Sequence, residues 1–396
     1  MTTIDTSERH FQTDGIHGGE EENPTSAVSS PVFQSSTYLF DDPEEIAAAM
    51  ASDAHPQFYG RYASPNTKQA ESVIAKMEGG EAGLVVASGM AAISLVLLNQ
   101  LKAGDHLVAQ RNIYPTSYNL ISKKLPQLGI ECTFVEQADR ESFDKALQDN
   151  TRLIYVESPA NPMLTLTDLR YVARLSKANN LVCVADNTFA TPYNQRPLEL
   201  GFDMVVHSAT KYLSGHSDVV AGAIVSSQET IARMWHDHIL LGGVLHPFEA
   251  WLLARGLKTF GVRMERHNSN AMAIAAYLND HPAVESVSYP GHSTHPQHML
   301  AKEQMTSGFG GMVSFTLKGG QSAVFSFLEN LKLISLAVSL GGVHSLISHP
   351  QTTISSVQAE EVRSSLGIQG GLLRLSVGLE DVEDLLADMG NSLIMP

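Results

Sequence analysis

Apolar runs and amphipathic stretches alternate through the middle of the chain. The apolar runs are four or five residues long and nearly unbroken, which is typical of strands buried on both faces of a parallel sheet. They cover residues 84–87, 106–109, 132–135, 153–156, 181–185, 204–207 and 222–225. Helical patterns fall between many of them, at residues 90–101, 116–128 and 169–179. This order predicts an α/β fold, with a mostly parallel sheet covered by helices on both faces.

The two ends of the chain follow other patterns. Residues 1–60 show no strong period and are interrupted by prolines, so we expect an extended arm with one short helix at 43–51. Residues 247–279 predict one long, kinked amphipathic helix that links two domains. Beyond it we expect a smaller α+β layer with strands at 284–289, 312–317, 334–338 and 373–377, and helices at 322–331, 359–366 and 382–392. The predicted division is an arm at 1–60, a large domain at 61–257 and a C-terminal domain at 258–396.

Composition and charge narrow the range of partners. The 396 residues, 43% of them hydrophobic and 17% charged, are ordinary for a globular chain of two or three domains. A balance of 26 basic against 42 acidic residues gives −16, which argues against nucleic acid or an anionic membrane as a partner. No apolar run is long enough to cross a bilayer, and residues 1–22 lack the apolar core of a signal peptide. Cys132 and Cys183 are expected to be buried free thiols, so we predict a cytoplasmic protein, without a metal site.

The most informative residues are a lysine among hydroxyls and an acid on an earlier strand. Lys211 follows Ser208 and Thr210, and Asp186 ends an apolar run. Ligands of parallel sheets bind at the carboxyl ends of the strands, where both groups fall. A lysine amine forms an imine with the aldehyde of pyridoxal phosphate, hydroxyls bind its phosphate, and an acid keeps its ring nitrogen protonated. On residue types alone, a solvated loop lysine and a helix-capping aspartate explain the pair about equally well.

Four further positions fit the same chemistry, each with a structural alternative. Gly89 opens a helix after a strand, where free backbone amides bind phosphate, although glycine is common at such turns. Tyr114 offers a face for stacking on a cofactor ring, or is a half-buried core tyrosine. Asn161 donates to the cofactor or only makes an Asn-Pro turn. Arg374 interrupts an apolar strand, which indicates a carboxylate site or an internal salt bridge.

Residues 208–222, SATKYLSGHSDVVAG, closely resemble the lysine signature of the Cys/Met-metabolism pyridoxal-phosphate enzymes. That family contains cystathionine γ-synthase, cystathionine lyases, O-acylhomoserine sulfhydrylases and methionine γ-lyase. Further matches occur in order at 59–66 (YGRYASPN), 88–90 (SGM), 186–188 (DNT), 263–267 (RMERH), 339–341 (SLG) and 373–381 (LRLSVGLED). The resemblance covers the chain from about residue 15. It implies the aspartate aminotransferase-like fold type I, pyridoxal 5'-phosphate as cofactor, and a homotetramer of two dimers.

The resemblance also implies a role for each match. Lys211 is the Schiff-base lysine and proton shuttle, and Tyr114 stacks on the ring and assists proton transfer. Asp186 partners the pyridine nitrogen. The phosphate is held by Gly89, Met90, Ser208 and Thr210, and by Tyr59 and Arg61 from the neighbouring subunit. The substrate carboxylate is bound by Arg374, with Ser339 and Asn161 assisting.

Two positions separate the members of the family. Cystathionine enzymes typically carry acids where this chain has Val338 and, in the γ-lyases, Phe58, so both positions look like methionine γ-lyase. After Tyr114, however, the chain reads Pro115-Thr116-Ser117, where methionine γ-lyases typically have Gly-Cys-Thr. The hydroxyl of Thr116 is a better neighbour for a polar leaving group than for a thioether. The residues around 238–239 also depart from the methionine γ-lyase pattern, in a loose alignment.

We therefore expect γ-elimination on a γ-substituted L-amino acid, methionine or homocysteine by default. The alternatives are a polar γ-substituent, such as the oxyguanidine of canavanine, and γ-replacement, as in a sulfhydrylase or cystathionine γ-synthase. A pyridoxal-binding storage protein would need neither the acid nor the electron sink. An aminotransferase of the same fold would exchange keto acids with glutamate.

Overall fold

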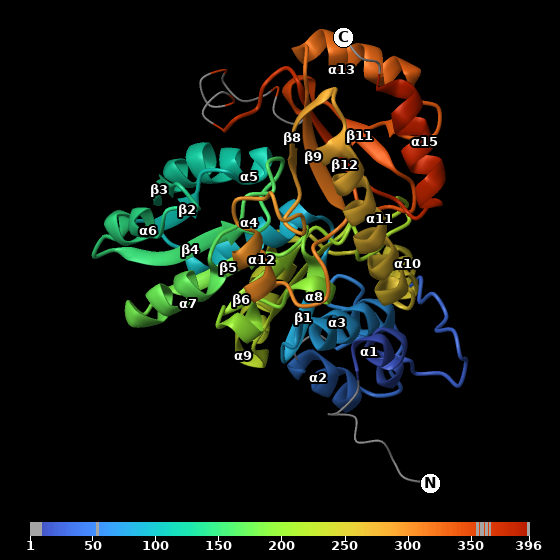
Figure 1. Ribbon diagram of the computed structural model, residues 1–396. Coiled ribbons are helices and arrows are strands. Elements are labelled where there is room, and N and C mark those ends of the chain that lie inside the picture. The colour runs from blue at the N-terminus through green and yellow to red at the C-terminus, as the bar shows by residue number, and fades with distance from the viewer. Residues whose placement is uncertain are drawn as a thin grey trace.

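The computed structural model of the protein describes residues 10–52, 55–353, 356, 360, 363 and 366–393 (Figure 1). The larger of its two sheets has the strand order β1-β7-β6-β5-β4-β2-β3. β7 runs antiparallel to both neighbours, and the other neighbouring pairs are parallel. The strands are β1 (Ala82–Val86), β2 (His106–Gln110), β3 (Glu131–Val135), β4 (Thr151–Glu157), β5 (Val182–Asp186), β6 (Met204–His207) and β7 (Gly222–Ser226). Each coincides with a predicted apolar run.

Both faces of this sheet are buried, as the unbroken apolar runs predict. On β2, Leu107 and Ala109 enter a core cluster with α4 and α9, whereas Val108 points to the opposite cluster, with α6 and α7. Successive side chains of a strand point to opposite faces, so one short run serves two cores. The helices on these faces are α3 (Pro65–Glu78), α4 (Gly89–Gln100), α6 (Arg140–Ala146), α7 (Leu169–Ala178) and α9 (Gln228–Leu241).

The smaller sheet has the order β10-β11-β12-β9-β8 and is mostly antiparallel. α13 and α15 cover it, in orange and red in Figure 1. Its elements are β8 (Val284–Ser288), β9 (Met312–Leu317), α13 (Gly320–Asn330), β10 (Ser335–Leu336), β11 (Leu346–Ser348), β12 (Leu372–Ser376) and α15 (Val382–Ser392). Only two residues of the strand predicted at 334–338 pair, and β11 was missed because it is three residues long. The helix expected at 359–366 lies largely outside the described residues.

The helix predicted at 247–279 is two helices, α10 (Pro247–Leu257) and α11 (Phe260–Asp280), which meet at Lys258 and Thr259. α11 ties both sheets together through two buried side chains. The guanidinium of Arg263 donates to the carbonyl oxygens of Tyr212 and Leu213, just past Lys211. Nδ1 of His267 lies 2.7 Å from the carbonyl oxygen of Val377, just past β12. The proposed domain boundary at 257/258 stays a prediction.

The N-terminal region contains more structure than the predicted arm. α2 (Pro43–Ala51) is where the sequence predicts it, with Asp42 as its N-cap. A second helix, α1 (Phe11–His17), was missed because it is short, holds a glycine and has no side-chain cap. It packs on the fold, since the ring of Phe11 lies 5.4 Å from that of Tyr193.

Other differences from the sequence prediction are local. The helix predicted at 116–128 divides into α5 (Pro115–Asn119), a π turn and a 3₁₀ turn. A helix at α12 (His298–Gln304) was not predicted. Cys183 is buried and Cys132 is half-buried, and neither forms a disulfide. Within the described part of the chain, no helix combines the length and apolar character that crossing a bilayer requires. Across the same residues, no cluster of His, Cys, Asp and Glu is arranged to hold a metal ion.

Candidate active site

A cavity of about 370 Å³ lies at the carboxyl ends of β4, β5 and β6, and segments of the smaller sheet close it. Parallel sheets place their ligands at this edge. The cavity brings together residues that lie up to 286 positions apart in the sequence, from Ser88 to Arg374. The predicted site residues that line it are Gly89, Met90, Tyr114, Asn161, Asp186, Ser208, Thr210, Lys211, Val338, Ser339 and Arg374.

Lys211 projects from the loop after β6 and is partly buried. Its Nζ donates to the hydroxyl of Ser339 at 2.8 Å. Burial, with a smaller contribution from the cation of Arg374, lowers the pKa of the Lys211 amine to about 8. A lysine amine with such a pKa is a nucleophile and a proton acceptor at near-neutral pH.

Asp186 ends β5 and is 7% exposed. Thr188 donates to Oδ1 from its backbone nitrogen at 3.1 Å and from its hydroxyl at 2.5 Å. The Tyr155 hydroxyl donates to the other oxygen at 3.3 Å. Burial raises the pKa of Asp186, and these hydrogen bonds oppose that rise. A cation placed against this carboxylate would favour its ionised form further.

Arg374, on β12, lines the cavity and is buried, at 3% exposure. Nη1 donates to Oδ1 of Asn161 at 3.0 Å, and Nη2 donates to the carbonyl oxygen of Ser339 at 3.1 Å. Its Nε, also buried, has no partner among the described residues. The competing interpretation was that Arg374 forms an internal salt bridge. None of the ion pairs between described residues includes Arg374, so the structure does not support that interpretation. A buried guanidinium held only by neutral groups retains donors for a carboxylate ligand.

Another part of the cavity lining, at the start of α4, suits an anion. The 12-residue helix α4 begins at Gly89, and the hydroxyl of Ser88 caps it by accepting from the Ala91 amide at 3.1 Å. A Cβ on Gly89 would come within 2.8 Å of Cβ of Ser208, so only glycine leaves this approach open. Helix N-termini bind phosphate through their free amides. The hydroxyl of Thr210 also lines the cavity, but it donates to the carbonyl oxygen of Ala221 at 3.1 Å.

Four predicted residues lie outside this cavity. Tyr59 and Arg61 are exposed, and Nη1 of Arg61 donates to the carbonyl oxygen of Ile239 at 2.7 Å. Phe58 packs against aromatic neighbours of the N-terminal region, and Thr116 is exposed on α5. The structure therefore gives Phe58 and Thr116 no contact with the cavity of their own chain.

Sequence reasoning missed one acidic group in the cavity. Glu157 ends β4 directly beside Asp186 in the strand register. It accepts from the backbone nitrogens of Tyr114 at 2.8 Å and Asn161 at 2.9 Å. Burial, and secondly the charge of Asp186, raise the pKa of Glu157 to about 8. An acid closing an apolar strand, as Asp186 does, was the available signal. Other missed lining residues are Ser88, Ile93, Thr188, Phe189, Val220 and Leu340.

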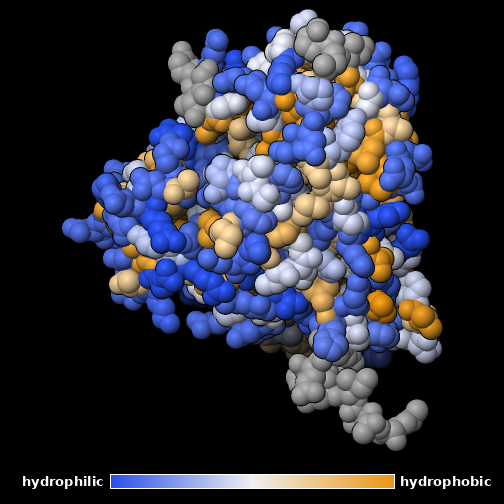
Figure 2. Space-filling view, viewed as in Figure 1, coloured by the Kyte–Doolittle hydropathy of each residue, from blue (hydrophilic) through white to orange (hydrophobic). Residues whose placement is uncertain are grey.

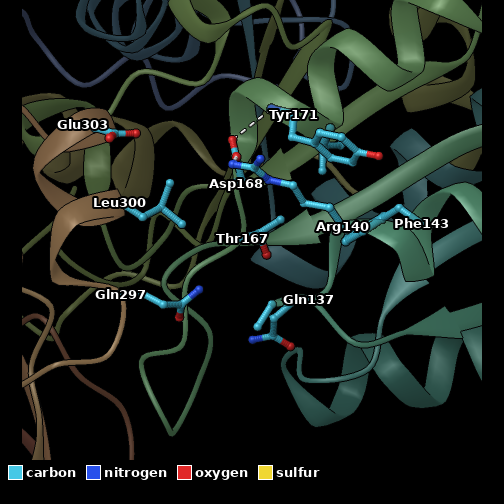
Figure 3. Close-up of a pocket in the computed structure, with 11 residues that line it drawn as sticks. Gln137, Arg140, Phe143, Thr167, Asp168, Tyr171, Gln297, Leu300 and Glu303 are labelled. Atoms are coloured by element: carbon cyan, nitrogen blue, oxygen red, sulfur yellow. Dashed lines mark hydrogen bonds and ion pairs between the residues drawn. The ribbon is translucent and has the colours of Figure 1, made fainter.

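A second cavity, of about 270 Å³, carries no comparable chemistry (Figure 3). None of the predicted site residues lines it. Arg140 pairs with Asp168 in it. The amide of Gln297 exchanges hydrogen bonds with the backbone of Leu166. The fold thus pairs Arg140, Asp168 and Gln297 internally, whereas the buried side-chain nitrogen of Gln137 has no partner among the described residues.

Pyridoxal phosphate fits the first cavity. The glycine at the start of α4 leaves room for a phosphate, and a cationic ring nitrogen would counter the raised pKa of the buried Asp186. Lys211 supplies an amine with a lowered pKa within the same cavity. The fold and the cavity are those of a pyridoxal-phosphate enzyme of the α/β class.

Comparisons with known proteins place the chain more narrowly. The sequence model of the Cys/Met metabolism PLP-dependent enzymes matches residues 12–394. The chain is 46% identical to an L-methionine γ-lyase of Fusobacterium nucleatum, over 96% of this chain and 97% of that protein. It is also 46% identical to a cystathionine γ-lyase of Bacillus subtilis, over the same shares of both chains. The crystal structure of metB from Corynebacterium glutamicum superposes with a TM-score of 0.92 at 40% identity, covering 98% of this chain and 99% of that one.

The chain belongs to the Cys/Met metabolism family of pyridoxal-phosphate-dependent enzymes. The predictions of this family, its cofactor, the fold type I architecture and a lyase of this family are confirmed. The two relatives above carry different names at equal identity, so the choice of amino acid depends on the site itself.

Proposed function

We propose that the enzyme catalyses γ-elimination on a γ-substituted L-amino acid with an uncharged side chain, methionine or homocysteine by default. The observation that carries this proposal is the polarity of the cavity. Among the described residues that line it, the one arginine, Arg374, is 3% exposed, whereas the apolar residues Val220 and Val338 are 56% and 59% exposed at its rim. An amino acid whose carboxylate meets Arg374 would direct its side chain toward this apolar rim. Among the described residues that line the cavity, the acids Glu157 and Asp186 are both buried, so a distal ammonium group at this rim would meet no exposed acid.

Each residue of the cavity has a task in this reaction. Bound pyridoxal phosphate supplies a ring that accepts electrons from the substrate α-carbon. The amine of Lys211 takes the proton from that carbon and returns it later in the reaction. Asp186 holds a proton at the ring nitrogen, and Arg374 orients the substrate carboxylate. Tyr114, which is 40% exposed, can hold a proton near the departing γ-group.

The other candidates have less support from the cavity. Thr116 supplied the argument for a polar leaving group such as that of canavanine, but its side chain is outside the cavity. γ-Replacement needs the same early proton transfers and an incoming nucleophile, which reaches the cavity through the same rim. The substrate comparison below distinguishes elimination of a polar γ-group and γ-replacement from the proposed reaction.

Steady-state turnover across methionine, homocysteine, O-acetylhomoserine, cystathionine and canavanine tests the proposal. Ammonia and keto-acid release are measured for each substrate, with and without added thiol. We expect the highest kcat/KM for methionine or homocysteine, with release of an α-keto acid and ammonia. Dominant turnover of cystathionine would contradict the interpretation of Val338, and thiol-dependent turnover without ammonia would assign γ-replacement.

We also propose that the active site is shared between two copies of the chain within a homotetramer. Tyr59 and Arg61 lie outside the cavity of their own chain, and the apolar Val28 and Leu39 nearby in sequence are 99% and 100% exposed. Figure 2 shows apolar side chains along the side where Figure 1 places α10 and α11. Phe248, on α10, is 49% exposed. A second copy would bury these groups and bring Arg61 to a neighbouring phosphate.

Subunit complementation tests this arrangement. Lys211→Ala and Arg61→Ala variants are each expected to have little activity, whereas a mixture unfolded and refolded together regains activity. One mixed site then combines Lys211 of one copy with Arg61 of the other. Failure to regain activity in mixed oligomers, whose mass is measured by light scattering, would contradict shared sites. The absence of disulfides at Cys132 and Cys183 supports a cytoplasmic location, which cell fractionation tests.

A further inference from the structure

We propose that Glu157 is a positioning residue that holds Tyr114 and Asn161 in place and, through Asn161, orients the guanidinium of Arg374. This role concerns the structure of the cavity, and hydrogen exchange tests it without any substrate. Only the kinetic part of the test rests on the function proposed above.

The first link joins Glu157 to the loop after β2. Its Oε2 accepts from the backbone nitrogen of Tyr114 at 2.8 Å. Tyr114 is the N-cap of α5, and no side chain caps that helix, so this hydrogen bond fixes the backbone at the tyrosine. The ring itself is 40% exposed, which leaves its placement to the backbone.

The second link joins Glu157 to the loop after its own strand. Its Oε1 accepts from the backbone nitrogen of Asn161 at 2.9 Å. The side chain of Asn161 then accepts from Nη1 of Arg374 at 3.0 Å. The carboxylate of Glu157 thus holds the backbone of both Tyr114 and Asn161, and Asn161 in turn orients Arg374.

Glu157 is itself held rigidly. It is 4% exposed, its strand pairs with β5 beside Asp186, and its carbonyl oxygen accepts from Nε2 of Gln110 at 2.7 Å. Both carboxylate oxygens accept amide protons, so one side chain ties the two loops together in either protonation state. These bonds stabilise one loop arrangement over others, because releasing either amide leaves a buried polar group unpaired.

The Glu157→Gln variant distinguishes this hydrogen-bonding role from simple packing. Glu157→Gln keeps the shape, but its one carbonyl oxygen can satisfy only one of the two amides. Hydrogen exchange, measured by mass spectrometry on the enzyme with its cofactor, should then accelerate in peptides that contain residues 114 and 161. Turnover of the best substrate should fall, with a higher KM and a kcat lower by about 10- to 100-fold, since one buried amide is left without a partner.

Two further variants complete the experiment. Asn161→Ala keeps the backbone amide but loses the bond to Arg374, so it should raise KM while exchange at residue 114 stays unchanged. In the double variant, the KM effect of Glu157→Gln should not add to that of Asn161→Ala, because both act through Arg374. Glu136→Gln is the matched control. Glu136 immediately follows β3, is exposed and pairs with Arg111, so its loss should change neither exchange at these loops nor kinetics.

Unchanged exchange at residues 114 and 161 in Glu157→Gln would overturn the proposal, and so would additive KM effects in the double variant. If Glu157→Gln does not fold, the exchange of residue 114 in Glu157→Asp, whose carboxylate is one methylene shorter, provides the same comparison. An enzyme that eliminates none of the tested substrates would reject the proposed function, but the exchange result would still judge the role of Glu157.

Discussion

The amine of Lys211 lies 2.8 Å from the hydroxyl of Ser339, which is 128 positions later in the chain. Lys211 follows β6 of the larger sheet, and Ser339 precedes β11 of the smaller one. Ser339 adopts φ of 78°, a left-handed conformation that costs a non-glycine residue about 1–3 kcal/mol. It also accepts from Arg374 through its carbonyl oxygen. The strained serine therefore joins the amine of Lys211 to the guanidinium of Arg374.

The lowered pKa of Lys211 predicts how cofactor capture depends on pH. Only the unprotonated amine attacks an aldehyde, so capture of pyridoxal phosphate by the cofactor-free protein should accelerate as pH rises through about 8. Arg374→Gln should move this midpoint to higher pH, because Arg374 is the second cause of the shift. Stopped-flow absorbance measures the rate. A midpoint near the ordinary lysine value, about 10.4, would contradict the burial of this amine.

The same shift predicts a sign for stability. The pKa of Lys211 is lower in the folded protein than in the unfolded chain. Between these two pKa values, the unfolded chain therefore holds the lysine proton while the folded protein has lost it. The penalty from Lys211 is therefore present in full below about pH 8 and disappears as pH rises toward the unfolded value. Lys211→Met should remove that penalty, so the variant should gain most over the cofactor-free wild type below pH 8. Denaturant unfolding at several pH values measures this, and a gain confined to high pH would reverse the sign.

Arg374→Ala should mainly weaken binding of free amino acids. Loss of charge-assisted hydrogen bonds, about 1.5–3 kcal/mol, corresponds to a KM roughly 10- to 100-fold higher. Arg374→Lys keeps the charge but loses the planar guanidinium, so its KM should lie between those of the wild type and Arg374→Ala. An unchanged KM in Arg374→Ala would count against a carboxylate role for this residue.

Gly89→Ala should weaken cofactor binding. The added methyl would lie 2.8 Å from Cβ and 2.9 Å from Cα of Ser208, so the start of α4 must shift, at a cost of about 1–3 kcal/mol. Gly243→Ala is the control, since its Cβ would meet only Cβ of Ala91 at 3.4 Å. Equilibrium titration with pyridoxal phosphate, followed by absorbance, compares the two. Equal affinities would argue against a phosphate at this helix start.

Val338→Glu should shift preference toward cystathionine. A carboxylate at this exposed rim position would pair with the distal ammonium group of that substrate and is worth up to about 1 kcal/mol, or roughly a fivefold gain in relative kcat/KM. Leu336→Glu, at a position 61% exposed but outside the cavity, is the control. Equal effects of the two variants on the cystathionine-to-methionine ratio would remove Val338 from the specificity of the enzyme.

The elements that the sequence predicted best are those whose pattern is local. β1 to β7 repeat short apolar runs because both faces are buried, and α15 begins and ends at the predicted residues behind the N-cap Asp381. The elements that were missed depend on distant partners. β11, three residues long, exists because β12 pairs with it, and α1 is held by contacts such as that of Phe11 with Tyr193. No local pattern encodes such pairings.

The residues of the candidate site also differ in how visible they are in the sequence. Lys211 and Asp186 were found because their chemistry is visible in residue type and strand position. Glu157 was missed, although it occupies the same position on β4 that Asp186 occupies on β5, because its partners are backbone amides of other loops. Thr116 shows the limit of reasoning from sequence neighbours, and its place at the site stays a prediction. Adjacency to Tyr114 in the sequence suggested a place in the cavity, but the turn into α5 directs it to solvent.

The most direct test of the account is to find the residue that carries the cofactor. The purified protein is incubated with pyridoxal phosphate, reduced with borohydride, digested and analysed by mass spectrometry. We expect a visible absorbance band before reduction and a pyridoxyl group on Lys211 after it, with both absent in Lys211→Ala. A colourless wild-type protein, or a label on another lysine, would contradict the assignment of this cavity as the active site.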